Sequence, residues 1–149
     1  MSREINIAAA DAFFKIFGLT REKGMSTKSM QRSLKQVKEL GWLYQNTEHW
    51  NPYSRRREDL WGFCDILCLD GKRTIAIQAC GADLASHRTK IYENEYVRAW
   101  LEAGNELEIW SWTKRKKVRG KKATYWHCKV TSVFLFHLDI YFEEVDNKQ

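Results

Sequence analysis

Two polar residues stand alone inside apolar segments of the sequence. Asp65 interrupts the apolar run at residues 62–69, and Gln78 interrupts a second run at residues 73–80. An Asp-Gly pair between the runs is a strong hairpin signal, so they are predicted to be antiparallel strands that bring the two polar side chains together. A buried carboxylate is costly unless it is paired or binds a metal. The pair is therefore a candidate divalent-cation site, and the alternative is a structural aspartate hydrogen-bonded to an arginine or to backbone amides.

Further polar and aromatic residues surround these two strands in the sequence. They are Glu48 with Trp50, Asn51 and Pro52, then Arg57, the stretch 59–63, and Lys90 with Ile91. As a set with Asp65 and Gln78, they resemble the PD-(D/E)XK nuclease superfamily, and within it phage and bacterial Holliday-junction-resolvase-like or restriction-endonuclease-like domains. The resemblance implies an endonuclease, a hydrolase that uses Mg²⁺ or Mn²⁺. It places Asp65 at the strand aspartate of that family and Gln78-Ala79-Cys80 at its (Glu/Asp)-x-Lys segment.

Two positions depart from the family pattern. Gln78 offers a neutral oxygen where the family has an acid, and Cys80 stands where the family has a lysine. The resemblance implies Lys90, on the following helix, as the substitute cation. Helical spacing instead turns Arg88 nearer the inward face. For both residues, a solvated helix charge is the alternative.

Two acidic residues complete the candidate site. Glu48 ends a predicted strand and is expected near the metal, where it could restore the charge that Gln78 lacks. Asp59 is a further candidate, but we expect it to pair with one of the arginines at 55–57. The predicted catalytic residues are Asp65, Gln78, Lys90 and Glu48, and the predicted metal ligands are Asp65, Gln78 and Glu48.

The chain is basic, with a formal net charge of +6 over 149 residues. This balance favours polyanionic partners, nucleic acid above all. Residues 114–122 hold a dense run of lysine and arginine that is predicted to be a hairpin loop contacting phosphates; a mobile solvated loop is the alternative. The residues expected to contact nucleic acid, with DNA favoured, are Arg55, Arg56, Arg57, Arg88, Lys116, Lys117, Lys121 and Lys122.

The remaining pattern predicts how these residues are held. Helices are expected over 4–17, from an N-cap at Ser26 to Gly41, and over 84–101. Strands are expected over 42–48, 62–69, 73–80, 107–112 and 124–133, and the stretch 134–145 is left unassigned. This order predicts one α/β domain over 1–149, with a PD-(D/E)XK-like mixed sheet made of a three-strand meander, a crossover helix and further strands. Residues 1–25 are expected to form an N-terminal helical extension.

The four cysteines are expected to be reduced core thiols, with Cys64 and Cys68 on one face of a strand. A zinc site made of Cys64, Cys68, His127 and Cys128 is the alternative. The sequence shows neither a secretory-type apolar run at its start nor a stretch apolar enough to cross a bilayer, so a cytoplasmic protein without membrane contact is expected. A homodimer is left open.

Three functions follow from these patterns. The first is a metal-dependent nuclease that hydrolyses DNA phosphodiester bonds, including those of branched or structured DNA. The second is a catalytically lapsed relative that serves as a nucleic-acid-binding or assembly module, which the departures at Gln78 and Cys80 keep open. The third is an RNA- or protein-binding module that uses surface tryptophans.

Overall fold

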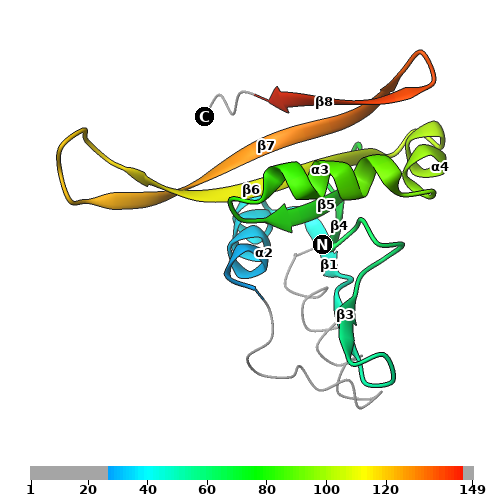
Figure 1. The fold of residues 1–149 in the computed structure, drawn as a ribbon, viewed down its shortest axis with the longest axis horizontal. Helices are drawn as coiled ribbons and strands as arrows, with labels where there is room; N and C mark the ends of the chain where they lie inside the picture. Colours follow the sequence, from blue (N-terminus) through cyan, green and yellow to red (C-terminus); the bar gives the residue numbers. More distant parts are fainter. Residues whose placement is uncertain (1–26, 146–149) are drawn as a thin grey trace.

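A computed structural model describes residues 27–145, and its main element is one six-stranded sheet (Figure 1). The sheet is made of β1 (Leu43–Asn46), β4 (Ile66–Leu69), β5 (Thr74–Cys80), β6 (Glu106–Lys116), β7 (Thr124–Phe136) and β8 (Asp139–Val145). A separate two-stranded ribbon is formed by β2 (His49–Asn51) and β3 (Arg56–Glu58). The helices among the described residues are α2 (Lys28–Leu40), α3 (Leu84–Glu93) and α4 (Val97–Glu102).

The order of the strands across the sheet is β1-β4-β5-β6-β7-β8. Every neighbouring pair in it is antiparallel except β5 and β6, which run parallel. A parallel pair needs a crossover, and α3 with α4 supply it. The predicted mixed α/β sheet, with a three-strand meander followed by a helical crossover, is therefore confirmed.

Helix α2 begins and ends on local signals. The N-cap is Thr27, whose Oγ1 accepts a hydrogen bond from the backbone N–H of Met30 at 3.1 Å. The predicted cap Ser26, the predicted helix over 4–17 and the predicted extension over 1–25 lie outside the described residues. The helix ends as predicted at Gly41, whose φ of 72° is the left-handed conformation that glycine adopts without a steric penalty.

The single helix predicted over 84–101 is wrong, because it is interrupted after Glu93. Asn94 is the cause: its side-chain amide donates to the carbonyl of Trp61 at 2.8 Å, and its side-chain oxygen accepts from the backbone N–H of Tyr96 at 2.8 Å. These bonds give the backbone an alternative to the helical pattern. The chain re-enters a helix at Val97, so the crossover consists of two short helices.

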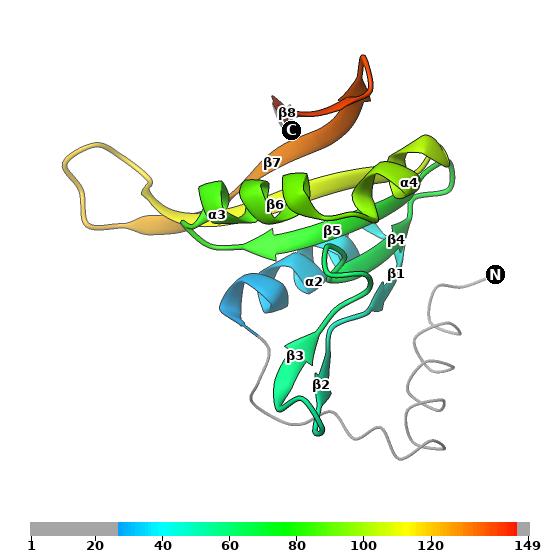
Figure 2. The same ribbon diagram turned by 45° about the vertical axis from the view of Figure 1, so that its right-hand side comes forward.

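The helices cover the two faces of the sheet separately, with α2 on one face and α3 and α4 on the other (Figure 2). Residues along β5 alternate between the two cores, as a strand requires. The α2 side is packed by Met30, Val37, Ile66, Cys68, Ile75, Ile77, Ala79, Trp110, Trp112 and Val130. The other side is packed by Phe63, Cys64, Ala76, Cys80, Ile91, Val97, Trp100, Leu107, Ile109, Val133 and Ile140.

The strand predicted over 62–69 begins only at Ile66. Before it, the chain makes a tight turn in which Trp61 and Gly62 both have positive φ, and the backbone N–H of Cys64 donates to the Leu60 carbonyl at 3.1 Å. Cys64 therefore packs on the α3–α4 side of the sheet while Cys68 packs on the α2 side. The expectation that both cysteines share one strand face is wrong for this reason.

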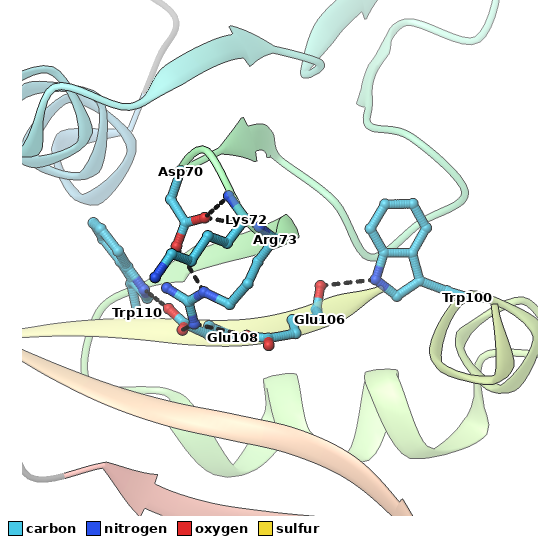
Figure 3. A network of polar contacts seen from close by, with 7 residues as sticks. All are labelled: Asp70, Lys72, Arg73, Trp100, Glu106, Glu108 and Trp110. Carbon is cyan, nitrogen blue, oxygen red and sulfur yellow. Dashed lines mark hydrogen bonds and ion pairs between the residues drawn. The ribbon is translucent and has the colours of Figure 1, made fainter. Parts of the chain in front are cut away.

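A polar network joins the start of β5 to β6, at the end of β5 opposite Cys80 (Figure 3). Arg73 donates to Asp70 and to Glu106, each at 2.7 Å, and lies 3.9 Å from Glu108. Asp70 also accepts from the backbone N–H groups of its own turn, and these bonds with the arginine hold its pKa at about 2. The network ties the β4–β5 turn to the neighbouring parallel strand.

The C-terminal stretch left unassigned by the sequence is the hairpin of β7 and β8. Its two turn residues, His137 and Leu138, both have positive φ, which is the conformation of the tight turns that suit twisted antiparallel strands. No helix among residues 27–145 is both long and apolar enough to cross a membrane.

Candidate active site

Asp65, the residue before β4, faces Gln78 of β5. Its backbone N–H donates to the carbonyl of Ile77 at 2.9 Å, and Ile77 is also the register partner of Ile66, the first residue of β4. Gln78 Nε2 donates to Asp65 Oδ2 at 2.7 Å, and the same oxygen accepts from the backbone N–H of Ala79 at 2.9 Å. Asp65 is 4% exposed and Gln78 is 3% exposed. The structure thus brings together the two residues that the sequence singled out.

Burial leaves one oxygen of this pair without a hydrogen-bond partner within residues 27–145 and disfavours the ionised form of the carboxyl. Gln78 Oε1 is buried and has no hydrogen-bond partner among the described residues. Burial, reinforced by the carboxylates of Asp59 and Glu48, raises the pKa of Asp65 to about 8, although the N–H of Ala79 opposes the shift. Leaving a buried oxygen unpaired costs about 1–3 kcal/mol. A bound cation would satisfy the amide oxygen and favour the ionised carboxylate.

Glu48 and Asp59 bring two more carboxylates to the same place. Glu48 lies between β1 and β2 and forms an ion pair with Arg57 of β3. Asp59 follows β3, hydrogen-bonds the Asp65 carboxyl, and forms an ion pair with Lys90 of α3 at 3.6 Å. The expected pairing of Asp59 with an arginine is therefore wrong, because the turn after β3 carries it toward α3.

These groups line one cleft of about 350 Å³ at the carboxyl end of β5. The cleft is bounded by the start of α2, the β2–β3 ribbon, the end of β5 and the first turns of α3. Its lining residues are Thr27, Ser29, Glu48, Arg57, Glu58, Asp59, Asp65, Gln78, Ala79, Cys80, Gly81, Asp83, His87 and Lys90. All four predicted catalytic residues are among them.

The two candidate cations of α3 lie in different places. Lys90 lines the cleft with 47% of its side chain exposed. Arg88 turns instead toward the sheet, where its guanidinium carbon lies 5.6 Å from the centre of the Phe142 ring on β8. Helical spacing therefore placed Arg88 inward correctly, but the inward direction leads to β8 and not to the cleft.

The three predicted nucleic-acid-binding arginines at 55–57 also separate. Arg57 lines the cleft but is already paired with Glu48, and Arg56 lies 3.8 Å from Glu58. Arg55 is exposed in the β2–β3 turn, where its φ of 53° is unusual for a residue with a side chain.

The basic run forms the end of a long β6–β7 hairpin that projects beyond the body of the sheet (Figure 1). We call residues 113–127 the arm. Lys116 ends β6, and the loop closes with a hydrogen bond from the backbone N–H of Lys117 to the Ala123 carbonyl at 2.9 Å. Lys121 and Lys122 are exposed in this loop. The predicted basic hairpin is confirmed, whereas its contact with nucleic acid stays a prediction.

The base of the arm carries an aromatic feature that the sequence analysis missed. The Arg32 guanidinium carbon of α2 lies 3.4 Å from the centre of the Trp126 ring, and Lys114 Nζ lies 6.0 Å from it. Trp126 is 44% exposed and its neighbour Tyr125 is 41% exposed. The adjacent aromatic residues at 125–126, close to the basic run, were visible in the sequence, but the contact with α2 was not.

None of the four cysteines forms a disulfide, and three of them are buried. The zinc site considered for Cys64, Cys68, His127 and Cys128 does not form. Over residues 27–145, the group of three or more His, Cys, Asp or Glu whose ligand atoms converge is Cys80, Asp83 and His87. Spacing alone did not reveal it, because only the end of β5 and the start of α3 bring these residues together.

Comparison of the chain with protein-family models, with curated proteins and with solved structures finds no match.

Proposed function

We propose that this protein is a divalent-metal-dependent nuclease whose active site is the cleft around Asp65 and Gln78. The observation that carries the proposal is the buried, unpartnered Oε1 of Gln78 beside the Asp65 carboxyl, in a cleft that Glu48, Asp59 and Lys90 also line. Buried polar atoms are rarely left without a partner in native proteins. An amide oxygen among carboxylates suits a hard cation such as Mg²⁺ or Mn²⁺.

The donor set fits such a cation in number and kind. Asp65, Gln78 and Glu48 would hold it, and Asp59 offers a further oxygen through its contact with Asp65. When bound, the cation would polarise a phosphodiester and lower the pKa of a water molecule so that it attacks at neutral pH.

The protein's own residues divide the remaining tasks. The N–H groups of Ala79 and Gln78 fix the Asp65 carboxylate, since both donate to its Oδ2. Arg57 orients Glu48 by ion pairing, and Lys90 at the rim offers a positive charge to a phosphate oxygen. The arm would hold the nucleic-acid backbone at a distance from the reacting bond.

The architecture supports the finer proposal of a PD-(D/E)XK-like nuclease. The candidate residues lie on an antiparallel hairpin, β4–β5, and on the crossover helix that follows it. The cation expected on the strand is replaced by Cys80, which is buried, so Lys90 is the lysine proposed to act in its place.

A cleavage assay tests this function directly. Chelator-treated protein is mixed with end-labelled single-stranded DNA, duplex DNA and a four-way junction, each with Mg²⁺, Mn²⁺ or no metal. We expect cleavage of at least one substrate, only with metal, and none from a folded Asp65→Asn variant. Cleavage in excess chelator, or its absence on every substrate with either metal, contradicts the proposal.

The variant Gln78→Glu separates an active nuclease from a lapsed one. In an active enzyme it restores a charged ligand at nearly the same volume, so metal affinity should rise and cleavage should persist. If unmodified protein binds DNA but cleaves it with neither metal, the binding-module alternative takes its place. If Gln78→Glu removes an existing activity, Gln78 acts through its amide donors and not as a metal ligand.

A further inference from the structure

A second group of ligand-type side chains meets beside the proposed active site. Cys80 is the last residue of β5, Asp83 is the N-cap of α3, and His87 lies one turn into that helix. One ligand atom from each lies within 4.8 Å of the other two. The three residues come from a rigid central strand and from the first turn of a helix, which is the kind of support that fixes ligand geometry.

The connection between strand and helix is itself held in place. Cys80 pairs with Ser111 in the parallel β5–β6 ladder, and Ser111 Oγ donates to the carbonyl of Gly81 at 2.8 Å. The chain therefore leaves β5 in one direction and enters α3 immediately. Because of this tight connection, Asp83 lies above the end of the strand and not away from it.

Of the two ring nitrogens of His87, one has a hydrogen-bond partner among the described residues. Its Nε2 lies 3.2 Å from Asp83 Oδ2, while Nδ1 is buried and has no hydrogen-bond partner within residues 27–145. The ring is 20% exposed and the Asp83 side chain is 62% exposed. Asp83 is therefore the exposed member of the group, on the side of the cleft. Cys80, which is only 3% exposed, is the buried member.

We propose that Cys80, Asp83 and His87 form a zinc-binding site with three protein ligands and one position open to water. Thiolate and imidazole are ligands that Zn²⁺ accepts readily, whereas Mg²⁺ prefers oxygen alone. At the usual Zn–N and Zn–O bond lengths of about 2.0–2.2 Å, the edge of a tetrahedron is about 3.3 Å. The 3.2 Å separation of the His87 and Asp83 atoms matches that edge.

Binding at this site releases a proton. The Cys80 thiol loses its proton to solvent as the sulfur becomes a thiolate ligand, and no oxidation or bond cleavage is involved. Ser111 contacts the thiol of Cys80, and its hydroxyl donates to the Gly81 carbonyl. That hydrogen bond does not depend on the proton of the thiol. The site is distinct from the proposed Mg²⁺ position in its ligand chemistry, although both line the same cleft.

The proposal does not depend on nuclease activity, because its test is spectroscopic. Reduced, chelator-treated and desalted full-length protein is titrated with Co²⁺, which reports thiolate ligation by a charge-transfer band and tetrahedral geometry by strong visible bands. We expect one Co²⁺ per chain with both signals, and their loss on addition of one equivalent of Zn²⁺.

Three variants of the ligands and two controls locate the site. Cys80→Ser should abolish the thiolate band, and His87→Gln and Asp83→Asn should each weaken Co²⁺ affinity at least about 10-fold. The matched controls Cys128→Ser and His127→Gln change the same residue types on β7 and should leave the titration unchanged. Circular dichroism checks folding, and the His87 and Asp83 variants keep the test decisive if the buried Cys80→Ser does not fold.

Three outcomes overturn the proposal. They are the absence of a thiolate band in the unmodified protein, a band that survives in folded Cys80→Ser, and Co²⁺ affinity unchanged in both His87→Gln and Asp83→Asn. In those cases the short contact between His87 and Asp83 is an ordinary hydrogen bond at the start of a helix.

Discussion

The cleft and the arm handle charge in opposite ways. In the cleft, Asp65 is almost completely buried, and the surrounding carboxylates are matched with Arg57 and Lys90. In the arm, most basic side chains are exposed at the end of a hairpin. Burial fixes a charged group in place at a cost in desolvation, whereas exposure leaves it hydrated and free to meet a phosphate.

Under the proposed function, this contrast predicts that the positioning of a substrate and the affinity for it come from different parts of the molecule. Groups in the cleft are held to within a hydrogen bond of each other and so can act on one bond of a substrate. Groups in the arm can supply binding free energy without a fixed geometry. Variants of the two regions should therefore affect different measured quantities.

The largest effect is expected from Asp65→Ala. Removing the central carboxylate should lower metal-dependent cleavage by at least about 100-fold, since even groups that only orient a metal ligand are worth about 10- to 100-fold. DNA affinity, measured by fluorescence anisotropy with Ca²⁺ in place of Mg²⁺, should change less than about twofold. Glu102→Ala, which removes one negative charge from the surface of α4, is the control. If Asp65→Ala lowered cleavage and DNA affinity by the same factor, the cleft would contribute to binding as well as to cleavage, and the proposed division between cleft and arm would be wrong.

The next effect concerns the two cations of α3. Lys90→Gln should reduce the cleavage rate at saturating DNA by at least about 10-fold, because a positive charge beside the reacting phosphate is lost. Arg88→Gln should leave that rate nearly unchanged and lower thermal stability slightly, since its side chain packs over Phe142. Single-turnover kinetics and thermal melts measure both. If Arg88→Gln lowers the cleavage rate more than Lys90→Gln does, the reacting phosphate does not lie beside Lys90.

A smaller effect, on binding alone, is expected from the arm. Changing Lys116, Lys117, Lys121 and Lys122 to glutamine should flatten the dependence of log affinity on log salt by roughly 0.9 for each lysine that contacts a phosphate. The maximal cleavage rate should be retained. A control pair, Lys35→Gln with Lys38→Gln on α2, is compared with Lys121→Gln with Lys122→Gln. If both pairs flatten the slope equally, overall charge and not the arm determines affinity.

The last effect, which needs no DNA substrate, is on stability without metal. The folded pKa of Asp65 is about 8, against an ordinary value of 3.8. Between these values the unfolded chain has lost the proton that the folded protein keeps, so stability falls as pH rises through this window and levels off above it. The melting temperature of the unmodified protein, relative to Asp65→Asn, should therefore fall between about pH 4 and pH 8. Mg²⁺ should reduce this fall. A difference that is constant with pH would show that Asp65 is ionised throughout.

Sequence alone predicted the parts of the site that depend on neighbouring strands. Asp65 and Gln78 meet because apolar alternation and one tight turn determine the register of β4 and β5. The partner of Asp59 was not predictable, because the turn before β4 and the position of α3 both depend on packing distant in sequence. The break at Asn94 was missed for a similar reason: its side chain contacts Trp61, which lies far earlier in the chain.

The parallel junction between β5 and β6 has a consequence for how the molecule forms. On one side of it, β1, β4 and β5 pair as antiparallel neighbours, and on the other side β6, β7 and β8 do the same. Hairpins close short loops and form within about 1–10 μs, whereas a parallel pair must wait for its crossover. We therefore expect each half to assemble early and the joining of β5 to β6 to be the slow step. On that expectation, the carboxyl end of β5, where the cleft lies, is completed only at that step, after the arm has formed.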